Sequence, residues 1–286
     1  MTPALARSYA FCERLARREA ANFYHAFRIL PTEQRRSMCA LYAFMRLTDD
    51  LADGPGAPDE KLGPLGDWRR QLSQALAGSY SHPVHAALHH TMQAHAIPGE
   101  YLEAVLDGVE MDLAPVVFPT FADLYRYCYR VASVVGLACI HIWGFQDDRA
   151  KLHAEQAGIA FQLTNILRDL AEDAARDRIY LPREDLERFG YTEQELRRGE
   201  RNDRFHALMR FQVDRARSYY AAASPLLSLL TPHGRAVYLV MLRTYRGLLD
   251  AIERRDYDVF SSRVRLSNWW KLGIVLRSLP VRWGWA

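Results

Sequence analysis

Several features that mark common protein classes are missing from this 286-residue sequence. Its four cysteines form no C-x-x-C pair and lie at no zinc-like spacing from histidine, which favours buried, reduced thiols in a cytoplasmic protein. The N-terminus is charged throughout and lacks the apolar core of a signal peptide. No run reaches the roughly 20 apolar residues that span a bilayer. The best run, residues 131–145, is shorter and contains His141, so we interpret it as a buried helix.

The net charge and the composition are those of an ordinary globular protein. A net charge of +3 is too small to indicate a nucleic-acid partner by itself, and none is expected. The hydrophobic content of 49% and charged content of 25% are typical of a globular protein. A chain of this length can bury a large core as one large domain or two small ones.

Acidic residues are absent after Asp258, whereas basic residues and tryptophans gather there. We call residues 265–286 the C-terminal tail. Basic residues mixed with Trp and Leu suit a segment that lies in a membrane interface, which would place the protein peripherally on the inner face of the membrane. A terminal helix docked on the domain, with its basic face in water, explains the same pattern. Both interpretations stay open.

Apolar residues recur at helical spacing along nearly the whole chain, and no stretch alternates as a strand does. Proline and glycine divide the chain into long helical blocks. The sequence therefore predicts an all-α protein with one domain over residues 1–286 and no long linker. The expected helices are 5–29, 33–53, 60–78, 82–96, 99–113, 120–143, 148–175, 201–230, 233–255 and 265–279.

One predicted helix ends in a cluster of acidic residues. Tyr42, Arg46, Asp49 and Asp53 are spaced by three or four, so they share one helical face. The same face is apolar further back, which indicates that a core-facing stripe becomes acidic before the helix ends. Asp50 is turned by about 100° from Asp49 and is the weaker candidate. We call Asp49 and Asp53 the first acidic cluster.

A second helix repeats this pattern. Its stripe starts at Gly158 and continues through Gln162 to Asn165, Asp169 and Asp173. A small, packable face again turns acidic toward the end of the helix. We call Asn165, Asp169 and Asp173 the second acidic cluster.

Carboxylates four residues apart on an inward face repel each other and are costly to desolvate without a partner. A divalent cation would be that partner, and oxygen ligands with no nearby Cys or His favour magnesium over zinc. Magnesium commonly completes its shell with phosphate oxygens, and Arg46 and Arg168 could also bind phosphate. Two such helices would clamp a diphosphate. The alternative for each cluster alone is a solvated helix end with ordinary ion pairs.

Other polar and aromatic residues carry weaker signals. Many aromatic rings lie near the acidic stripes and could stabilise a carbocation, although for any single ring a core position is the simpler explanation. Residues 127–136 are rich in small and β-branched residues, which predicts a closely packed helix. His141 is expected to be a core residue. Residues 176–182 form either a loop that closes over diphosphate or a plain surface loop.

Three segments resemble the squalene/phytoene synthase family, and the similarity extends from Phe23 to about Arg263. The segments are Y-A-F-M-R-L-T-D-D-L-A-D at 42–53, Y-C-Y-R-V-A-S-V-V-G at 127–136, and G-I-A-F-Q-L-T-N-I-L-R-D-L-A-E-D with R-I-Y-L-P at 158–182. The resemblance implies an isoprenoid-synthase-type helical bundle around a central cavity. It also implies head-to-head joining of two prenyl diphosphates through a cyclopropylcarbinyl diphosphate, with release of diphosphate.

The resemblance assigns roles to individual residues. The magnesium ligands would be Asp49, Asp53, Asn165, Asp169 and Asp173, and the diphosphate contacts would be Arg46, Arg168 and Tyr245. Tyr42 and Tyr127 would lie against the reacting carbons, with Tyr127 or the released diphosphate as proton acceptor. Phe23 would line a prenyl pocket. One departure is the run Arg18-Glu19-Ala20-Ala21-Asn22, where many relatives carry hydroxyls that help bind one diphosphate.

Substrate and product are less well determined by the sequence. Segments 23–31 and 256–264 look most like bacterial enzymes that make presqualene diphosphate or squalene for hopanoids, which favours farnesyl diphosphate. The alternative is a phytoene synthase acting on geranylgeranyl diphosphate for carotenoids. NADPH would be required only if squalene is the end product. A terpene cyclase and a non-enzymatic, membrane-associated helical scaffold are further alternatives, and other enzymes of the pathway could be partners.

Overall fold

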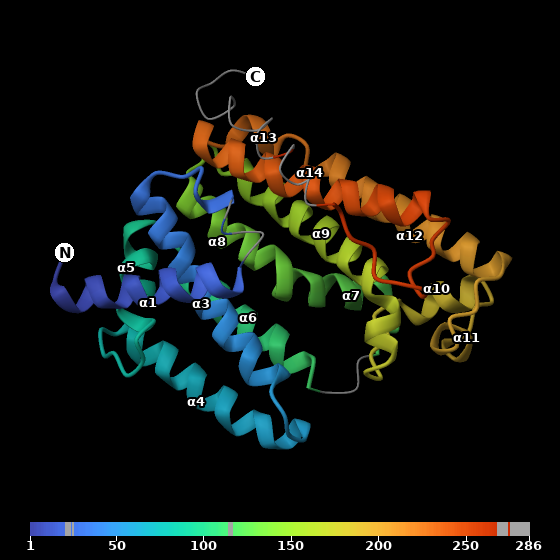
Figure 1. Cartoon of the computed structure of the whole chain (residues 1–286), viewed down its shortest axis with the longest axis horizontal. Coiled ribbons are helices and arrows are strands. Elements are labelled where there is room, and N and C mark those ends of the chain that lie inside the picture. The colour runs from blue at the N-terminus through green and yellow to red at the C-terminus, as the bar shows by residue number, and fades with distance from the viewer. Residues whose placement is uncertain (21–23, 25, 114–116, 268–273, 275–286) are drawn as a thin grey trace.

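The computed structural model describes residues 1–20, 24, 26–113, 117–267 and 274, and in these ranges the chain is helical with no β-strand. Only an isolated bridge between Phe145 and Leu230 has β geometry there. The helices pack around a central group formed by α3, α6, α8 and α9, which α14 completes (Figure 1). The prediction of an all-α fold is confirmed.

The helices follow the expected blocks closely. Their bounds are α1 (Pro3–Glu19), α3 (Thr32–Asp53), α4 (Pro58–Leu76), α5 (His85–Ala94), α6 (Gly99–Met111), α7 (Phe121–Cys128), α8 (Val134–Trp143), α9 (Arg149–Ala174), α10 (Arg183–Arg188), α11 (Glu193–Arg197), α12 (Asp203–Ala222), α13 (Leu226–Leu229) and α14 (Pro232–Arg254). A π-helical turn, η1 (Tyr129–Ser133), joins α7 to α8.

The prediction and the structure differ at four places. The expected helix 5–29 is too long, since α1 ends at Glu19 and Ala20 is its C-cap. The expected helix 201–230 is interrupted at residues 223–225, where Pro225 removes a backbone donor and α12 gives way to α13. The segment after residue 182 contains α10 and α11, which the sequence analysis did not predict because both are too short to show periodicity. The expected helix 265–279 is wrong at residues 265–267, which are irregular, and most of its remainder lies outside the described residues.

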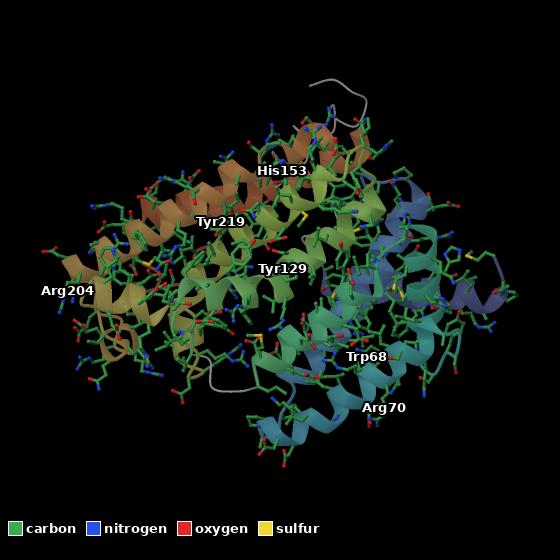
Figure 2. All side chains as sticks on the ribbon, turned by 180° about the vertical axis from the view of Figure 1, so that it is seen from behind. Trp68, Arg70, Tyr129, His153, Arg204 and Tyr219 are labelled. Carbon is green, nitrogen blue, oxygen red and sulfur yellow. The ribbon has the colours of Figure 1, made fainter. Side chains whose placement is uncertain are left out.

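The central helix α9 is held by an unusually close contact with η1. A Cβ atom on Gly158 would lie 2.4 Å from the Ser133 Cα, so only glycine fits there. Gly108 of α6 approaches η1 from another side, where a Cβ would lie 2.8 Å from a methyl carbon of Val131. Figure 2 marks Tyr129, the first residue of this turn, between α7 and α8. The close packing predicted for 127–136 is thus observed, and it is centred on a π-helical turn, a feature frequent at functional sites.

The helix α3 is anchored by α4 on the side away from α9. Phe44 stacks on Trp68 with ring centroids 5.7 Å apart, and the Trp68 indole donates a hydrogen bond of 2.9 Å to the buried hydroxyl of Thr48. In the described ranges no helix is long and apolar enough to cross a membrane. The tryptophans of the C-terminal tail lie outside the described residues, so its interfacial role stays a prediction.

Candidate active site

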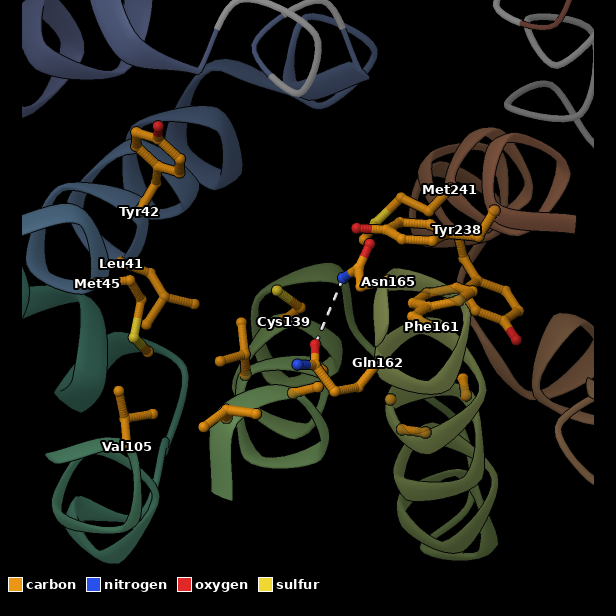
Figure 3. Close-up of a pocket in the computed structure, with 18 of the residues that line it drawn as sticks. Leu41, Tyr42, Met45, Val105, Cys139, Phe161, Gln162, Asn165, Tyr238 and Met241 are labelled. Atoms are coloured by element: carbon orange, nitrogen blue, oxygen red, sulfur yellow. Dashed lines mark hydrogen bonds between the residues drawn. The ribbon is translucent and has the colours of Figure 1, made fainter. Parts of the chain in front are cut away.

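A cavity of about 420 Å³ lies between α3, α6, α8, α9 and α14. Its walls are largely apolar, and Figure 3 shows Leu41 and Met45 of α3 on one side with Phe161 of α9 and Met241 of α14 on the other. The polar groups that reach it include Asp49, near the end of α3, and those of α6, α7 and α9. The cavity therefore suits an apolar molecule whose polar end lies near Asp49.

The first acidic cluster lies at the end of α3, as predicted. Asp49 lines the cavity and is accessible to water, and Asp53 is exposed one helical turn further on. The surrounding protein and the nearby Asp53 raise the pKa of Asp49 to about 7, because both disfavour its negative charge. Arg46 forms an ion pair of 2.6 Å with Asp50, so neither ligand candidate holds this guanidinium.

The second acidic cluster has a different arrangement. Asn165 lines the cavity, and its amide donates to the Gln162 side chain at 3.4 Å, drawn as the dashed line in Figure 3. Asp169 is paired with Arg168 and also with Arg263, the latter at 3.0 Å. Arg263 comes from the segment after α14, and it also contacts Glu172 at 3.2 Å. Sequence reasoning placed no cation from the end of the chain on this helix.

Asp173 is the last member of the second cluster. Burial and the neighbouring Asp169 raise its pKa to about 7, although Arg178 and Arg176 oppose the shift. Asp173 and Asp49 thus share one electrostatic state: each is a carboxylate beside another carboxylate with too little positive charge nearby. Such groups gain most from a bound cation.

The donor set bears directly on the expected magnesium. Among the described residues no group of three His, Cys, Asp or Glu side chains is already assembled as a metal cage. Magnesium does not need one, since it is commonly held by one or two carboxylates and completes its octahedral shell with water and substrate phosphates. The under-compensated carboxylates of both clusters, with only oxygen donors, therefore fit magnesium bound together with a diphosphate.

The predicted aromatic residues also reach the cavity. Tyr42, Tyr127 and Tyr245 all line it. Tyr245 stacks on Phe161 with ring centroids 4.4 Å apart, and burial raises its pKa while a hydrogen bond with Asn165 opposes that shift. The remaining aromatic candidate, Phe23, lies outside the described residues.

Sequence reasoning missed Asp112, which follows the last residue of α6 and lines the cavity. Its carboxylate accepts hydrogen bonds from the hydroxyls of Tyr127 and Tyr180. A signal was available, because an acidic residue at a helix C-terminus is unfavourable in the helix dipole and needs a reason. Asp53 and Asp173 are candidates because they lie near the C-terminal ends of their helices, and Asp112 lies at the end of α6 in the same way.

Residues 176–182 are not a plain surface loop. Ile179, Tyr180 and Leu181 are buried, and the Arg178 guanidinium donates to the main-chain oxygen of Asp112 at 3.2 Å. The turn is possible because Asp177 adopts a positive φ of 59°. His141, which was expected in the core, is only partly buried, with Nδ1 3.1 Å from the carbonyl oxygen of His95.

Comparison with known proteins agrees with this geometry. A sequence profile described as squalene/phytoene synthase matches residues 16–270. The chain is 38% identical to a 15-cis-phytoene synthase of Synechococcus elongatus, over 97% of this chain and 92% of that protein. It is 39% identical to a phytoene synthase of Arthrospira platensis, over 93% of this chain and 90% of that protein.

Solved structures show the same fold. A dehydrosqualene synthase crystal structure with a ligand superposes with a TM-score of 0.87 at 29% identity, covering 96% of both chains. A squalene synthase from Alicyclobacillus acidocaldarius gives a TM-score of 0.85 at 28% identity, covering 90% of this chain and 97% of that one. With the cavity, the two acidic helices and these similarities together, the chain belongs to the squalene/phytoene synthase family.

Proposed function

We propose that this prenyltransferase-type enzyme condenses two molecules of geranylgeranyl diphosphate head to head to give phytoene. The observation that carries the proposal is an apolar cavity reached by both acidic helices. Phytoene synthases at 37–39% identity over nearly the whole chain favour this substrate over farnesyl diphosphate, which the sequence analysis had preferred. The phytoene synthase alternative, with geranylgeranyl diphosphate as substrate, is thus the better supported one.

In the proposed complex, the two clusters would hold magnesium together with the substrate diphosphate. Asp49 and Asp53 act from α3, and Asn165, Asp169 and Asp173 act from α9. The bound magnesium would neutralise the negative charge of the departing diphosphate. Arg46, Arg168 and Tyr245 contact phosphate oxygens, and Arg168 would exchange its contact with Asp169 for one with phosphate. This arrangement needs no preformed metal cage in the free protein.

The cavity itself has two tasks in this proposal. Its apolar walls exclude water from the allylic cation that forms when diphosphate leaves. The aromatic rings of Tyr42, Tyr127 and Phe161 line the cavity, and the π-face of such a ring attracts a cation. The whole chain acts as one catalytic domain, and Phe23 is proposed to line the prenyl pocket.

Product identification tests this proposal. The purified protein is incubated with magnesium and either geranylgeranyl or farnesyl diphosphate, with and without NADPH, and the extracted lipids are identified. We expect a C40 triene from geranylgeranyl diphosphate without NADPH. Squalene formed only with NADPH would support the farnesyl alternative, and a cyclic product of unchanged carbon number would indicate a terpene cyclase. No coupled product from either substrate would refute the condensation.

The C-terminal tail is proposed to place the enzyme on a membrane surface, where its lipid-like substrates and products partition. Its basic composition supports this, since anionic lipids attract Lys and Arg. The test compares sedimentation of the full chain and a chain ending at Arg265 with anionic liposomes. Equal binding of both would refute the role of the tail. A scaffold without catalysis would retain function when Asp49 and Asp169 are replaced by Asn.

A further inference from the structure

Asp112 holds two tyrosines with its two carboxylate oxygens. The Tyr127 hydroxyl donates to Oδ2 at 3.0 Å, and the Tyr180 hydroxyl donates to Oδ1 at 2.9 Å. The two rings stack with centroids 5.2 Å apart and planes inclined by 27°. Segments at the end of α6, in α7 and after α9 therefore meet at one carboxylate.

The direction of the hydroxyl protons follows from these contacts. A tyrosine hydroxyl has one proton and two acceptor lone pairs, whereas an ionised carboxylate can only accept. The Tyr127 proton is therefore on the Asp112 side, and the oxygen keeps its lone pairs for other contacts. Both Tyr127 and Asp112 line the cavity. A reacting molecule in the cavity can thus reach Tyr127. The hydroxyl proton of Tyr127 is hydrogen-bonded to the Asp112 carboxylate.

The electrostatics restrict what Tyr127 can do alone. Burial, and then the neighbouring Asp112, raise the pKa of Tyr127 well above its usual value, so it is a neutral phenol. A neutral phenol is a weak base unless it gives up its own proton while accepting another. Burial also raises the pKa of Asp112, although Tyr180, Arg178 and Tyr127 oppose the shift. A carboxylate of raised pKa is a better proton acceptor than an ordinary one.

We propose that Tyr127 and Asp112 form a proton relay that deprotonates the carbocation of the condensation, with Asp112 acting through Tyr127 as a positioning residue and final acceptor. This inference rests on the proposed function. A C–H bond beside the cationic centre breaks, and its electron pair forms a carbon–carbon bond. The proton goes to the Tyr127 oxygen while the Tyr127 proton moves to Oδ2 of Asp112.

The relay balances without a further reactant. The cation loses its positive charge and the carboxylate loses its negative charge in the same step, so no oxidant or reductant is required. Asp112 is only partly buried, so its acquired proton can return to water when product leaves. The sequence leaves two proton acceptors open, Tyr127 and the released diphosphate. In the relay, Tyr127 is the acceptor.

The decisive variant is Asp112→Asn, which keeps the shape of the side chain but cannot take up the proton. Turnover of geranylgeranyl diphosphate is followed by two readouts, released diphosphate and coupled C40 product. We expect diphosphate release to fall less than about threefold while coupled product falls roughly 100-fold, the lower end for losing a general base. Because the coupled cation cannot lose its proton, it should revert to the allylic cation, whose capture by water accumulates prenyl alcohol, and KM should stay unchanged.

Matched variants separate this role from a structural one. Tyr180→Phe removes the other hydrogen bond to the same carboxylate and should change the ratio of coupled product to diphosphate much less than Asp112→Asn does. Asp112→Glu should recover part of the coupling. Combining Asp112→Asn with Tyr127→Phe should cost no more than either change alone, because both interrupt one relay.

Three outcomes would overturn the relay. One is wild-type coupling by Asp112→Asn, and another is a parallel loss of both readouts with a lower melting temperature, as an anchor would give. Either would leave the proposed function intact, because wild-type protein would still couple. Wild-type protein that couples neither diphosphate refutes the proposed function and the relay together. The hydrogen bond is checked without turnover, since Asp112→Asn should shift the ¹³Cζ resonance of labelled Tyr127.

Discussion

The two acidic clusters have similar sequences but different surroundings. On α3, Asp49 faces the cavity with a like-charged neighbour and has no ion pair within the part of the chain that the structure describes, because Arg46 is paired with Asp50. On α9, Asp169 is already held by two guanidiniums, one of them brought by Arg263 from beyond α14. Identical spacing of acidic residues therefore does not determine how readily a helix binds a cation. Asp49 can bind a cation directly, whereas Asp169 must first exchange a protein cation.

The largest effect is expected from removing one carboxylate on each helix. Asp49→Asn and Asp169→Asn should each lower kcat by about 10²–10³-fold, the range for losing one electrostatic stabiliser of the transition state. Steady-state kinetics with geranylgeranyl diphosphate and magnesium measure this. Asp50→Asn is the matched control beside Asp49 and should cost less than tenfold. Equal losses for Asp50→Asn and Asp49→Asn would contradict the assignment of Asp49.

Protonation of one buried histidine beside α3 should destabilise the fold in acid. Burial, with a smaller contribution from His82, lowers the pKa of His85 to about 4, and His85 packs on Trp68, which anchors α3. The unfolded chain then binds the proton first, so the free energy of unfolding falls as pH drops from about 6.5 toward 4. His85 alone is expected to contribute a loss on the order of 2 kcal/mol, which protonation of Asp49 and Asp173 opposes because their pKa values are raised in the folded chain.

Thermal unfolding at pH 7.5 and pH 5 measures this loss. A His85→Gln variant cannot be protonated and should lose less stability between the two pH values than the wild type does. An unchanged pH dependence in His85→Gln would show that other groups control acid sensitivity.

The anchoring of α9 can be tested separately. Gly158→Ala places a Cβ against the Ser133 backbone, which cannot shift as a flexible side chain would. We expect a loss of about 1–3 kcal/mol of unfolding free energy. Gly63→Ala on α4 is the control, since nothing lies within 4 Å of its Cβ position, and it should stabilise slightly. A neutral Gly158→Ala would mean that α9 moves freely past η1.

The smallest effect concerns the protein cation on Asp169. Arg263→Gln removes a partly exposed ion pair, a class of contact worth about 0.2–1 kcal/mol. Magnesium alone should then stabilise the substrate-free protein with a midpoint lowered roughly threefold, the equivalent of about 0.65 kcal/mol. Thermal shift against magnesium concentration measures it. Arg217→Gln, which breaks a remote pair with Glu253, should leave the midpoint unchanged.

Much of this architecture could be predicted because it follows from local periodicity. The three-and-four spacing that places Asp49 and Asn165 on inward faces depends on one helix at a time, and both do line the cavity. The contacts of Asp112 with Arg178 and Tyr180, and of Arg263 with Asp169, join segments 66 or more residues apart, so no local pattern shows them. The short helix α11 did have a readable signal, since Thr192 and Glu195 form a capping box at its start.

The position of α14 has a consequence for how the protein is made. Tyr42 of α3 and Tyr245 of α14 line the same cavity, although about two hundred residues separate them along the chain. During synthesis the inner apolar surfaces of α3 and α6 therefore emerge long before α14 exists to cover them. Exposed apolar surface of this kind promotes aggregation in partly folded chains. Ribosome-bound chains that stop before α14 should accordingly depend on chaperones, whereas the finished chain should not.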